Sequence, residues 1–223
     1  MPIFAIRKKD KTQWRLLHDL RKVNNQMEIM GALQPRLPVL SLIPEGWAIV
    51  VIDIKDCFFS IPLSDEDSKR FAFTLPAINK GQPATRWQWV VLPQGMANSP
   101  TLCQMYMAEA LNPVRDRYPE AVLLHYLDDI LIADQTPERA ENLRLIVTAS
   151  LEKRGLRIAE QKIQRGSSIK YLGSVILPTG IQAQLITLSA EITNLHEAQK
   201  LVGALQWLRQ FAPVTTEEMH PFY

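Results

Sequence analysis

The chain has 223 residues, of which 47% are hydrophobic and 22% charged, so it is long enough to bury a core and is expected to be globular rather than disordered. Its apolar stretches fall short of the ~18–20 residues of a membrane span, and its start does not resemble a signal peptide, so no membrane partner is expected. The only cysteines, Cys57 and Cys103, are too few for a disulfide scaffold or a cysteine-based zinc site. They are expected to be buried free thiols in a reducing, intracellular compartment.

The net charge of +2 is unevenly distributed along the chain. Residues 1–22 contain seven lysines and arginines against two aspartates, a net charge of +5, and the remaining residues carry −3. This cluster indicates contact with a polyanion such as nucleic acid. The alternative is a solvated hairpin with basic side chains.

The first third of the chain predicts short strands separated by breakers. Residues 2–8 and 13–18 are predicted to pair through the polar turn 9–12, and prolines and glycine interrupt residues 19–46. Residues 47–54 form an apolar run typical of a buried strand, and they contain an acid, Asp53, near their end.

Asp65-Glu66-Asp67 contains a D-x-D pattern, which nucleotide-sugar transferases also use. Ser64 precedes it, so we favour a helix N-terminus with acidic residues in its first turn.

The later elements alternate between strands and helices. They are strands at 71–75 and 86–92, a helix from Ser99-Pro100 to about Leu111, a helix at 136–155, a hairpin of 170–177 with 181–185, and a final helix at about 190–209. The helix at 136–155 is expected to bury Ala140, Leu143, Val147 and Leu151 and to expose Glu138, Glu141 and Arg144. The final helix is expected to place Leu195, Ala198, Val202, Leu205 and Leu208 in one stripe. This order predicts an α+β fold with helices on one face of an antiparallel sheet.

The stretch at 122–132 is unusual because two apolar runs flank the adjacent acids Asp128 and Asp129. The runs are typical of buried strands, and the break between them predicts a hairpin turn. Two neighbouring carboxylates in such a place repel each other and suit a hard cation such as Mg²⁺. The alternative is an ordinary Asp-Asp turn that faces water.

Several motifs follow one another in a fixed order: residues 2–10 with Trp14-Arg15, Asp53 followed by Phe58, Leu92-Pro93-Gln94-Gly95, and Tyr126-Leu127-Asp128-Asp129. In this order and spacing they resemble the retroviral reverse transcriptases, whose fold is the right-hand polymerase palm. The resemblance covers the chain nearly from end to end.

The resemblance implies RNA-directed DNA polymerase activity, in which a nucleotide passes from a deoxynucleoside triphosphate to a primer 3′-hydroxyl on an RNA or DNA template. Asp53, Asp128 and Asp129 would be the catalytic residues and would bind two Mg²⁺ ions, with Mn²⁺ as a substitute. Phosphoryl transfer needs charge neutralisation and positioning rather than a covalent nucleophile, and the chain offers no obvious nucleophile pair.

The resemblance also implies roles for residues around the carboxylates. The nucleotide-binding residues would be Lys8, Arg15, Asp56, Cys57, Phe58, Gln94 and Gly95. The residues next to primer or template would be Tyr126, Leu127, Tyr171, Leu172 and Gly173. Lys162 aligns with a lysine proposed in the family as general acid, although residues 160–168 match poorly. Without the resemblance, Lys8 and Arg15 would be solvated side chains and Phe58 a core aromatic beside Phe59.

The family's architecture divides the chain into five expected segments: 1–46 (part of the fingers), 47–70 (first part of the palm), 71–92 (fingers strands), 93–187 (palm with the primer-grip hairpin) and 188–223 (start of the thumb). Leu127 stands where most retroviral enzymes have methionine, which is expected to alter fidelity at most.

The chain is expected to be a fragment of a Pol polyprotein from an endogenous retrovirus-like element, located in the cytoplasm or virion core. The rest of the fingers and thumb, the connection and the ribonuclease H domain would lie outside it. Alone it would be weakly active or inactive, and a dimer is one assembly that the family allows. Two alternatives stay open: a catalytically silent nucleic-acid-binding remnant, and an RNA-templated RNA polymerase, against which Phe58 speaks.

Overall fold

The computed structural model describes residues 3–7, 14–34, 37–77, 81–186, 192–209 and 211–222. Its strands are β1 (Ile3–Arg7), β2 (Trp14–His18), β3 (Ala48–Lys55), β4 (Ala72–Leu75), β5 (Thr85–Gln88), β6 (Val122–Tyr126), β7 (Asp129–Asp134), β8 (Arg157–Ile158), β9 (Gln164–Arg165), β10 (Ile169–Tyr171), β11 (Ser174–Leu177) and β12 (Gly180–Ala183). Its helices are α1 (Arg21–Asn24), α2 (Asp65–Ser68), α3 (Ser99–Arg117), α4 (Pro137–Glu152), α5 (Leu195–Leu208) and α6 (Thr216–Met219). Within these ranges, no helix is long and apolar enough to cross a bilayer.

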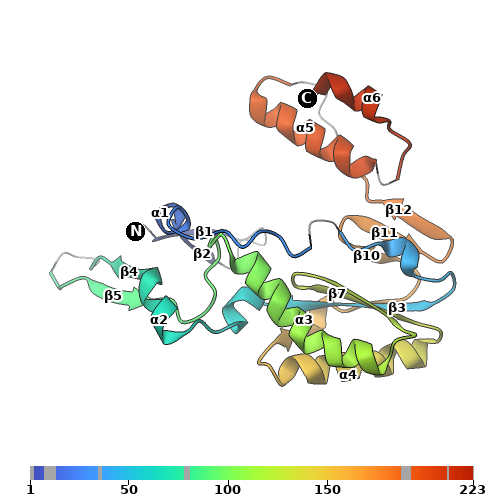
Figure 1. Ribbon diagram of the computed structural model, residues 1–223, viewed down its shortest axis with the longest axis horizontal. Coiled ribbons are helices and arrows are strands. Elements are labelled where there is room, and N and C mark those ends of the chain that lie inside the picture. Colours follow the sequence, from blue (N-terminus) through green and yellow to red (C-terminus); the bar gives the residue numbers. More distant parts are fainter. Residues whose placement is uncertain are drawn as a thin grey trace.

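An antiparallel sheet at the centre of the molecule has the strand order β6-β7-β3-β8, and β9 also pairs with β3. β3 and β7 lie side by side from the pair Ala48↔Asp134 to the pair Asp53↔Asp129. β6 joins β7 through the tight turn at Leu127-Asp128. Helices packed on an antiparallel sheet confirm the predicted α+β fold (Figure 1).

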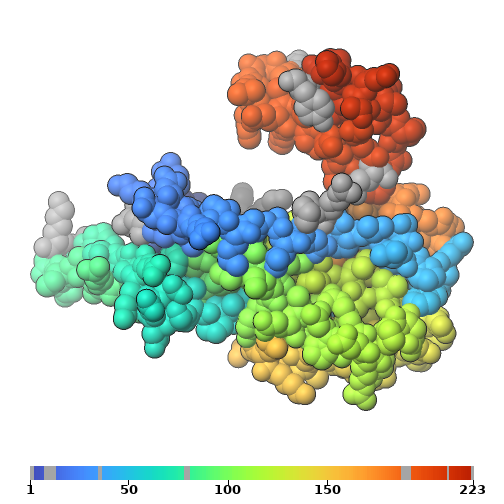
Figure 2. Space-filling view, in the orientation of Figure 1, coloured from blue at the N-terminus to red at the C-terminus, as the bar shows by residue number. Residues whose placement is uncertain are grey.

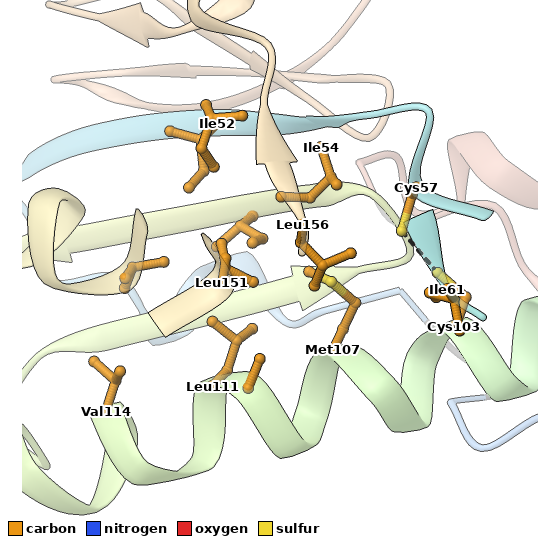
Figure 3. Close-up of a cluster of buried hydrophobic side chains, with 14 of the residues drawn as sticks. Ile52, Ile54, Cys57, Ile61, Cys103, Met107, Leu111, Val114, Leu151 and Leu156 are labelled. Atoms are coloured by element: carbon orange, nitrogen blue, oxygen red, sulfur yellow. Dashed lines mark hydrogen bonds between the residues drawn. The ribbon is translucent and has the colours of Figure 1, made fainter. Parts of the chain in front are cut away.

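Both faces of this sheet are buried, because successive side chains of a strand point to opposite sides. One face packs on α3 and α4 through a first core whose strand residues are Val50, Ile52, Ile54, Ile130 and Ile132. Figure 3 shows Met107 and Leu111 of α3 directed at these strands. The other face packs on the three-stranded sheet β10-β11-β12 through a second core, which contains Val51, Leu131, Ala133, Ile169, Tyr171 and Ile176.

The helix α3 is longer than the sequence predicted. It continues through Pro113 to Arg117, so the predicted end near Leu111 was wrong, and its N-cap is Asn98 rather than Ser99. Proline removes one backbone hydrogen bond from a helix. Leu111 and Val114 are buried in the first core on either side of it, and this packing keeps the helix intact.

The helix α4 buries the four residues expected of it, and Thr136 caps it by accepting the N–H of Arg139. Arg144 was expected on its exposed face but is only 8% exposed, so that prediction was wrong. Its Nη2 lies 2.7 Å from Oε1 of Glu141, and Arg165 of β9 contacts the same carboxylate, with Nε 3.1 Å from Oε2. Glu141 therefore links Arg144 to β9 on a side of α4 that the helical pattern alone would leave in water.

Two hairpins, β1 with β2 and β4 with β5, form separate two-stranded sheets on the left of Figure 1. Both match the strands predicted there, although β5 ends at Gln88 and only an isolated bridge, Pro62↔Val91, follows it. Ser64 caps α2 by accepting the N–H of Asp67, so the D-x-D motif begins a helix as predicted.

The single strand predicted at 170–177 is two strands, β10 and β11. A turn at Leu172 and Gly173 separates them, with φ of 46° and 83°. Positive φ at both central residues is the geometry of a tight hairpin, and it reverses the chain inside a run that looks continuous in sequence.

The last helix, α5, begins after Asn194, whose side chain accepts the N–H of Glu197. Residues 187–191, where the helix was predicted to begin, lie outside the described residues. Leu195, the first residue of the expected apolar stripe, is 73% exposed. The helix α6 was not predicted, although Thr215 and Glu218 form a capping box whose pattern is present in the sequence.

Candidate active site

Three carboxylates meet at one end of the central sheet. Asp53, near the end of β3, is the register partner of Asp129, the first residue of β7, and Asp128 precedes it in the turn. The carbonyl oxygen of Asp128 accepts the N–H of Ile54 at 2.9 Å, which fastens the turn to β3. The fold thus brings together the three aspartates that the sequence predicted to form one site.

The turn that carries Asp128 has a strained backbone. Leu127 has φ of 52°, in the left-handed region, which costs a residue with a side chain about 1 kcal/mol or more. Its N–H donates to Oε1 of Gln104 at 2.9 Å, and Gln104 is a buried residue of α3. The sequence analysis missed Gln104. In the sequence, Gln104 stands out as a polar amide among the largely apolar residues of this predicted helix.

Burial makes this site unfavourable for negative charge. Burial, together with the negative charges of Asp128 and Asp53, raises the pKa of Asp129 to about 6. The pKa of Asp128 is also raised, chiefly by burial. A cation would relieve this cost.

A lysine already lies against these carboxylates. Nζ of Lys162 donates to both carboxylate oxygens of Asp53, at 2.8 and 2.9 Å. This bond raises the pKa of Lys162. The backbone holds the lysine nearby, because the N–H of Ala159, just before the turn that carries Lys162, donates to the carbonyl oxygen of Asp53 at 2.8 Å.

The donor chemistry of the site fits a divalent cation, since carboxylate oxygens are the ligands that Mg²⁺ prefers. Within the described ranges, however, no three Asp, Glu, His or Cys side chains are arranged as a formed metal-binding cluster. The ammonium group of Lys162 takes the oxygens of Asp53 instead. The carboxylates are therefore close together without being organised around a metal ion.

The chain turns sharply after β3. Asp56 has φ of 49°, and a short 3-10 turn, Cys57–Ser60, follows it. Cys57 is buried with its Sγ 3.0 Å from Sγ of Cys103 (Figure 3), and both are free thiols, as predicted. Burying Cys57 fixes the turn against α3.

The two phenylalanines of this turn lie in different surroundings. Phe58 is half-buried and packs at the edge of the first core. Phe59 stacks on Trp89, with ring centroids 5.5 Å apart and planes 4° apart.

The loop that contains Gln94 and Gly95 is held by a residue that the sequence analysis missed. Asn24 donates from Nδ2 to the carbonyl oxygen of Gly95 at 2.9 Å and accepts the N–H of Ala97 at 3.0 Å. Gly95 has φ of 96°, which suits glycine, and Gln94 is half-buried beside it. Two bonds from one amide thus fix the shape of this loop.

Of the two basic residues expected to bind the triphosphate, the structure describes only Arg15. Arg15 is exposed on β2, and Arg7 of the paired strand lies 5.0 Å from the ring of the exposed Trp14. Lys8 lies outside the described residues.

The turn between β10 and β11 links the carboxylates to α5. Tyr171 is buried, and its hydroxyl donates to the carbonyl oxygen of Asp129 at 3.5 Å. Leu172 also lines a cleft of about 990 Å³, whose other walls are residues 37–41 and α5 (Figure 2). Gly173 faces Trp207 of α5, because a Cβ at Gly173 would lie 2.9 Å from Cζ2 of the indole.

Comparison with known proteins agrees with this geometry. A profile of the family "Reverse transcriptase (RNA-dependent DNA polymerase)" matches residues 6–176. Over its whole length the chain is 47% identical to the intracisternal A-particle Pol-related polyprotein of mouse intracisternal A-particle MIA14, of which it covers 26%. It is also 47% identical to the Gag-Pro-Pol polyprotein of sheep pulmonary adenomatosis virus, of which it covers 13%. It is 45% identical to the Gag-Pol polyprotein of Rous sarcoma virus subgroup C, strain Prague, of which it covers 14%.

The chain thus spans about a quarter or less of the length of these relatives. The family profile covers most of the chain and includes all three carboxylates and the strands that carry them. On these grounds the chain belongs to the reverse transcriptase (RNA-dependent DNA polymerase) family.

Proposed function

We propose that the chain contains the polymerase site of an RNA-directed DNA polymerase. The reaction is template-directed transfer of a nucleotide from a deoxynucleoside triphosphate to the 3′-hydroxyl of a primer paired with RNA or DNA. The observation that carries the proposal is the meeting of Asp53, Asp128 and Asp129 at one end of the sheet in a chain of this family.

The three aspartates are the proposed ligands of two Mg²⁺ ions, which neutralise the charge that develops on the oxygens during phosphoryl transfer. The raised pKa values of Asp128 and Asp129 support this assignment, because buried carboxylates gain most from a cation. The fastened turn keeps two of the ligands opposite the third, which reduces the reorganisation needed when ions bind.

The residues proposed to bind the nucleotide are Lys8, Arg15, Asp56, Cys57, Phe58, Gln94 and Gly95. Lys8 and Arg15 would bind the triphosphate, and the turn at Asp56 and Cys57 would offer backbone N–H groups to it. Phe58, held by the first core, would leave no room for a 2′-hydroxyl. Gly95 permits close approach of the backbone.

The primer and template are proposed to contact Tyr126, Leu127, Tyr171, Leu172 and Gly173. Tyr171 supports this proposal because it joins the hairpin turn to the backbone of Asp129. In the same proposal, residues 1–46 and 71–92 belong to the fingers, 47–70 and 93–187 to the palm, and 188–223 to the thumb. The cleft beside α5 would admit the duplex.

The parent protein is proposed to be a longer Pol polyprotein, because the relatives that the chain matches are Pol polyproteins of several times its length. The remaining thumb, connection and ribonuclease H segments would then be partners in the same polyprotein. The proposal also includes a dimer of the parent protein and its location in the cytoplasm or virion core.

Primer extension tests the proposal. The 223-residue chain, and the same chain with the following segment of its reading frame, would extend an oligo(dT) primer on poly(rA) with dTTP and Mg²⁺. We expect Asp128→Asn to lower extension by about a hundredfold or more, since it removes a charge that stabilises the transition state. Asp116→Asn, on the exposed side of α3, is the matched control. Tight binding of the duplex without extension by either chain would instead identify a catalytically silent nucleic-acid-binding protein.

A further inference from the structure

The bond between Lys162 and Asp53 occupies oxygens that a metal ion would need. Both carboxylate oxygens of Asp53 accept hydrogen bonds from Nζ of Lys162, at 2.8 and 2.9 Å, so each oxygen already has a positively charged partner. The Asp53 side chain is 16% exposed, whereas that of Lys162 is 58% exposed. The carboxylate is therefore fixed, and the lysine is the partner that can move.

The backbone sets up this contact. The strand β8 pairs with β3, Ala159 binds the carbonyl oxygen of Asp53, and the N–H of Lys162 donates to the carbonyl oxygen of Ala159 at 2.8 Å. The backbone of Lys162 is therefore held beside Asp53. Its flexible four-carbon side chain can leave the carboxylate without disturbing the fold.

We propose that Lys162 is a built-in competitor of the divalent cation at Asp53. Without a divalent cation, its ammonium group neutralises the carboxylate. A cation that binds to Asp53 must displace it, so the lysine lowers the apparent affinity of the site for metal. Displacement also leaves a free ammonium beside the site, where the triphosphate would bind. This inference rests on the proposed function, because it concerns the same carboxylates.

Titration of Mn²⁺, followed by electron paramagnetic resonance without nucleotide or nucleic acid, tests the inference on the 223-residue chain. Lys162→Met should bind Mn²⁺ about threefold to tenfold more tightly than the unchanged protein, in keeping with a partly exposed ion pair. Lys162→Arg should bind it no more tightly than the unchanged protein, because its planar fork keeps the contact with a carboxylate.

Removing any nearby positive charge favours a cation to some extent, so a matched control is needed. Lys55 is exposed on β3, two residues beyond Asp53. Lys55→Met removes a charge that acts on the carboxylates only at long range. It should therefore raise the affinity for Mn²⁺ less than Lys162→Met does, and this gain should disappear at high salt. Equal effects of the Lys55 and Lys162 variants, or no gain in affinity for Lys162→Met, would overturn the inference.

A second measurement needs no variant. The ¹H–¹⁵N signals of the lysine ammonium groups should include one slowed in exchange by its bond to Asp53, and saturating Mg²⁺ should remove it. Persistence of this signal at saturating Mg²⁺ would also overturn the inference. The proposed function fails separately, if Mn²⁺ binding by the unchanged protein is absent or is indifferent to Asp128→Asn.

Discussion

Asp129 is placed where its negative charge is costly, and this cost raises its pKa. Burial, together with the charges of Asp128 and Asp53, raises its pKa from 3.8 to about 6. A carboxyl group with a higher pKa in the folded protein binds more protons when folded than when unfolded, between these two values. The contribution of Asp129 to the free energy of unfolding should therefore fall as the pH rises from about 4 to 6 and stay level above this range.

We expect Asp129→Asn to raise the free energy of unfolding at pH 7 by about 1 kcal/mol, a figure reduced for the solvent that still reaches this side chain. The gain should vanish near pH 4, where Asp129 is protonated. Urea denaturation in EDTA at pH 4, 5.5 and 7 would measure it. Asp116→Asn, with an exposed side chain, should give no such pattern. A variant that is less stable at pH 7 would show that the buried charge is compensated within the chain.

His125 acts on stability in the opposite direction over nearly the same pH range. Burial, together with the positive charge of Arg115, lowers its pKa to about 4. The unfolded chain then binds more protons between pH 4 and 6.5, so this residue weakens the fold as the pH falls through that range. The whole protein can therefore show little pH dependence, and only the difference between the protein and its Asp129 variant isolates the carboxylate.

At the scale of elements, the hairpin β10-β11 and the helix α5 fit together because Gly173 lacks a side chain. A Cβ at Gly173 would lie 2.9 Å from the indole of Trp207, whereas a Cβ at Gly166 would meet nothing within 4 Å. Both glycines have positive φ, 83° and 103°. Alanine at either position is therefore strained, but only at Gly173 does it also collide with α5.

We expect Gly173→Ala to cost about 1–3 kcal/mol more than Gly166→Ala, because overpacking adds to backbone strain. It should also speed dissociation of a primer-template, since the hairpin and α5 line one cleft. Urea denaturation and stopped-flow dissociation would measure the two effects. Trp207→Leu should rescue Gly173→Ala but not Gly166→Ala. Equal costs for the two alanine variants would show that the contact with Trp207 is unimportant.

The elements that periodicity and turn residues specify could be predicted from the sequence. They include the buried strand ending near Asp53 and the hairpin at Asp128, because continuous apolar runs and acidic residues at their ends are local signals. The contacts of Gln104, Asn24 and Arg144 could not be predicted, because each depends on which distant segment covers the residue. The bond of Lys162 to Asp53 belongs to the same class, since it joins residues 109 positions apart.

The whole molecule combines a basic N-terminal segment with an acidic site. Residues 1–22 carry a net charge of +5 and the rest of the chain −3. The hairpin β1-β2 of this segment lies on the left of Figure 1, and α5 and α6 lie above the hairpin β10-β11, with the cleft between α5, residues 37–41 and Leu172 (Figures 1 and 2). A polyanion is attracted by the basic segment and repelled by the three carboxylates.

The affinity of the chain for a primer-template should therefore fall steeply with salt, because each phosphate contact releases counterions. Neutralising Lys8 and Lys9 together, as Lys8→Gln with Lys9→Gln, should reduce the slope of log affinity against log salt concentration by up to ~2, about one for each lost phosphate contact. Fluorescence anisotropy of a labelled duplex from 50 to 300 mM KCl would measure the slope. Lys153→Gln, at the end of α4 and away from the cleft (Figure 1), should leave the slope unchanged. If the control lowers the slope as much per charge as the double variant does, binding follows net charge alone and residues 1–22 do not form the contact surface.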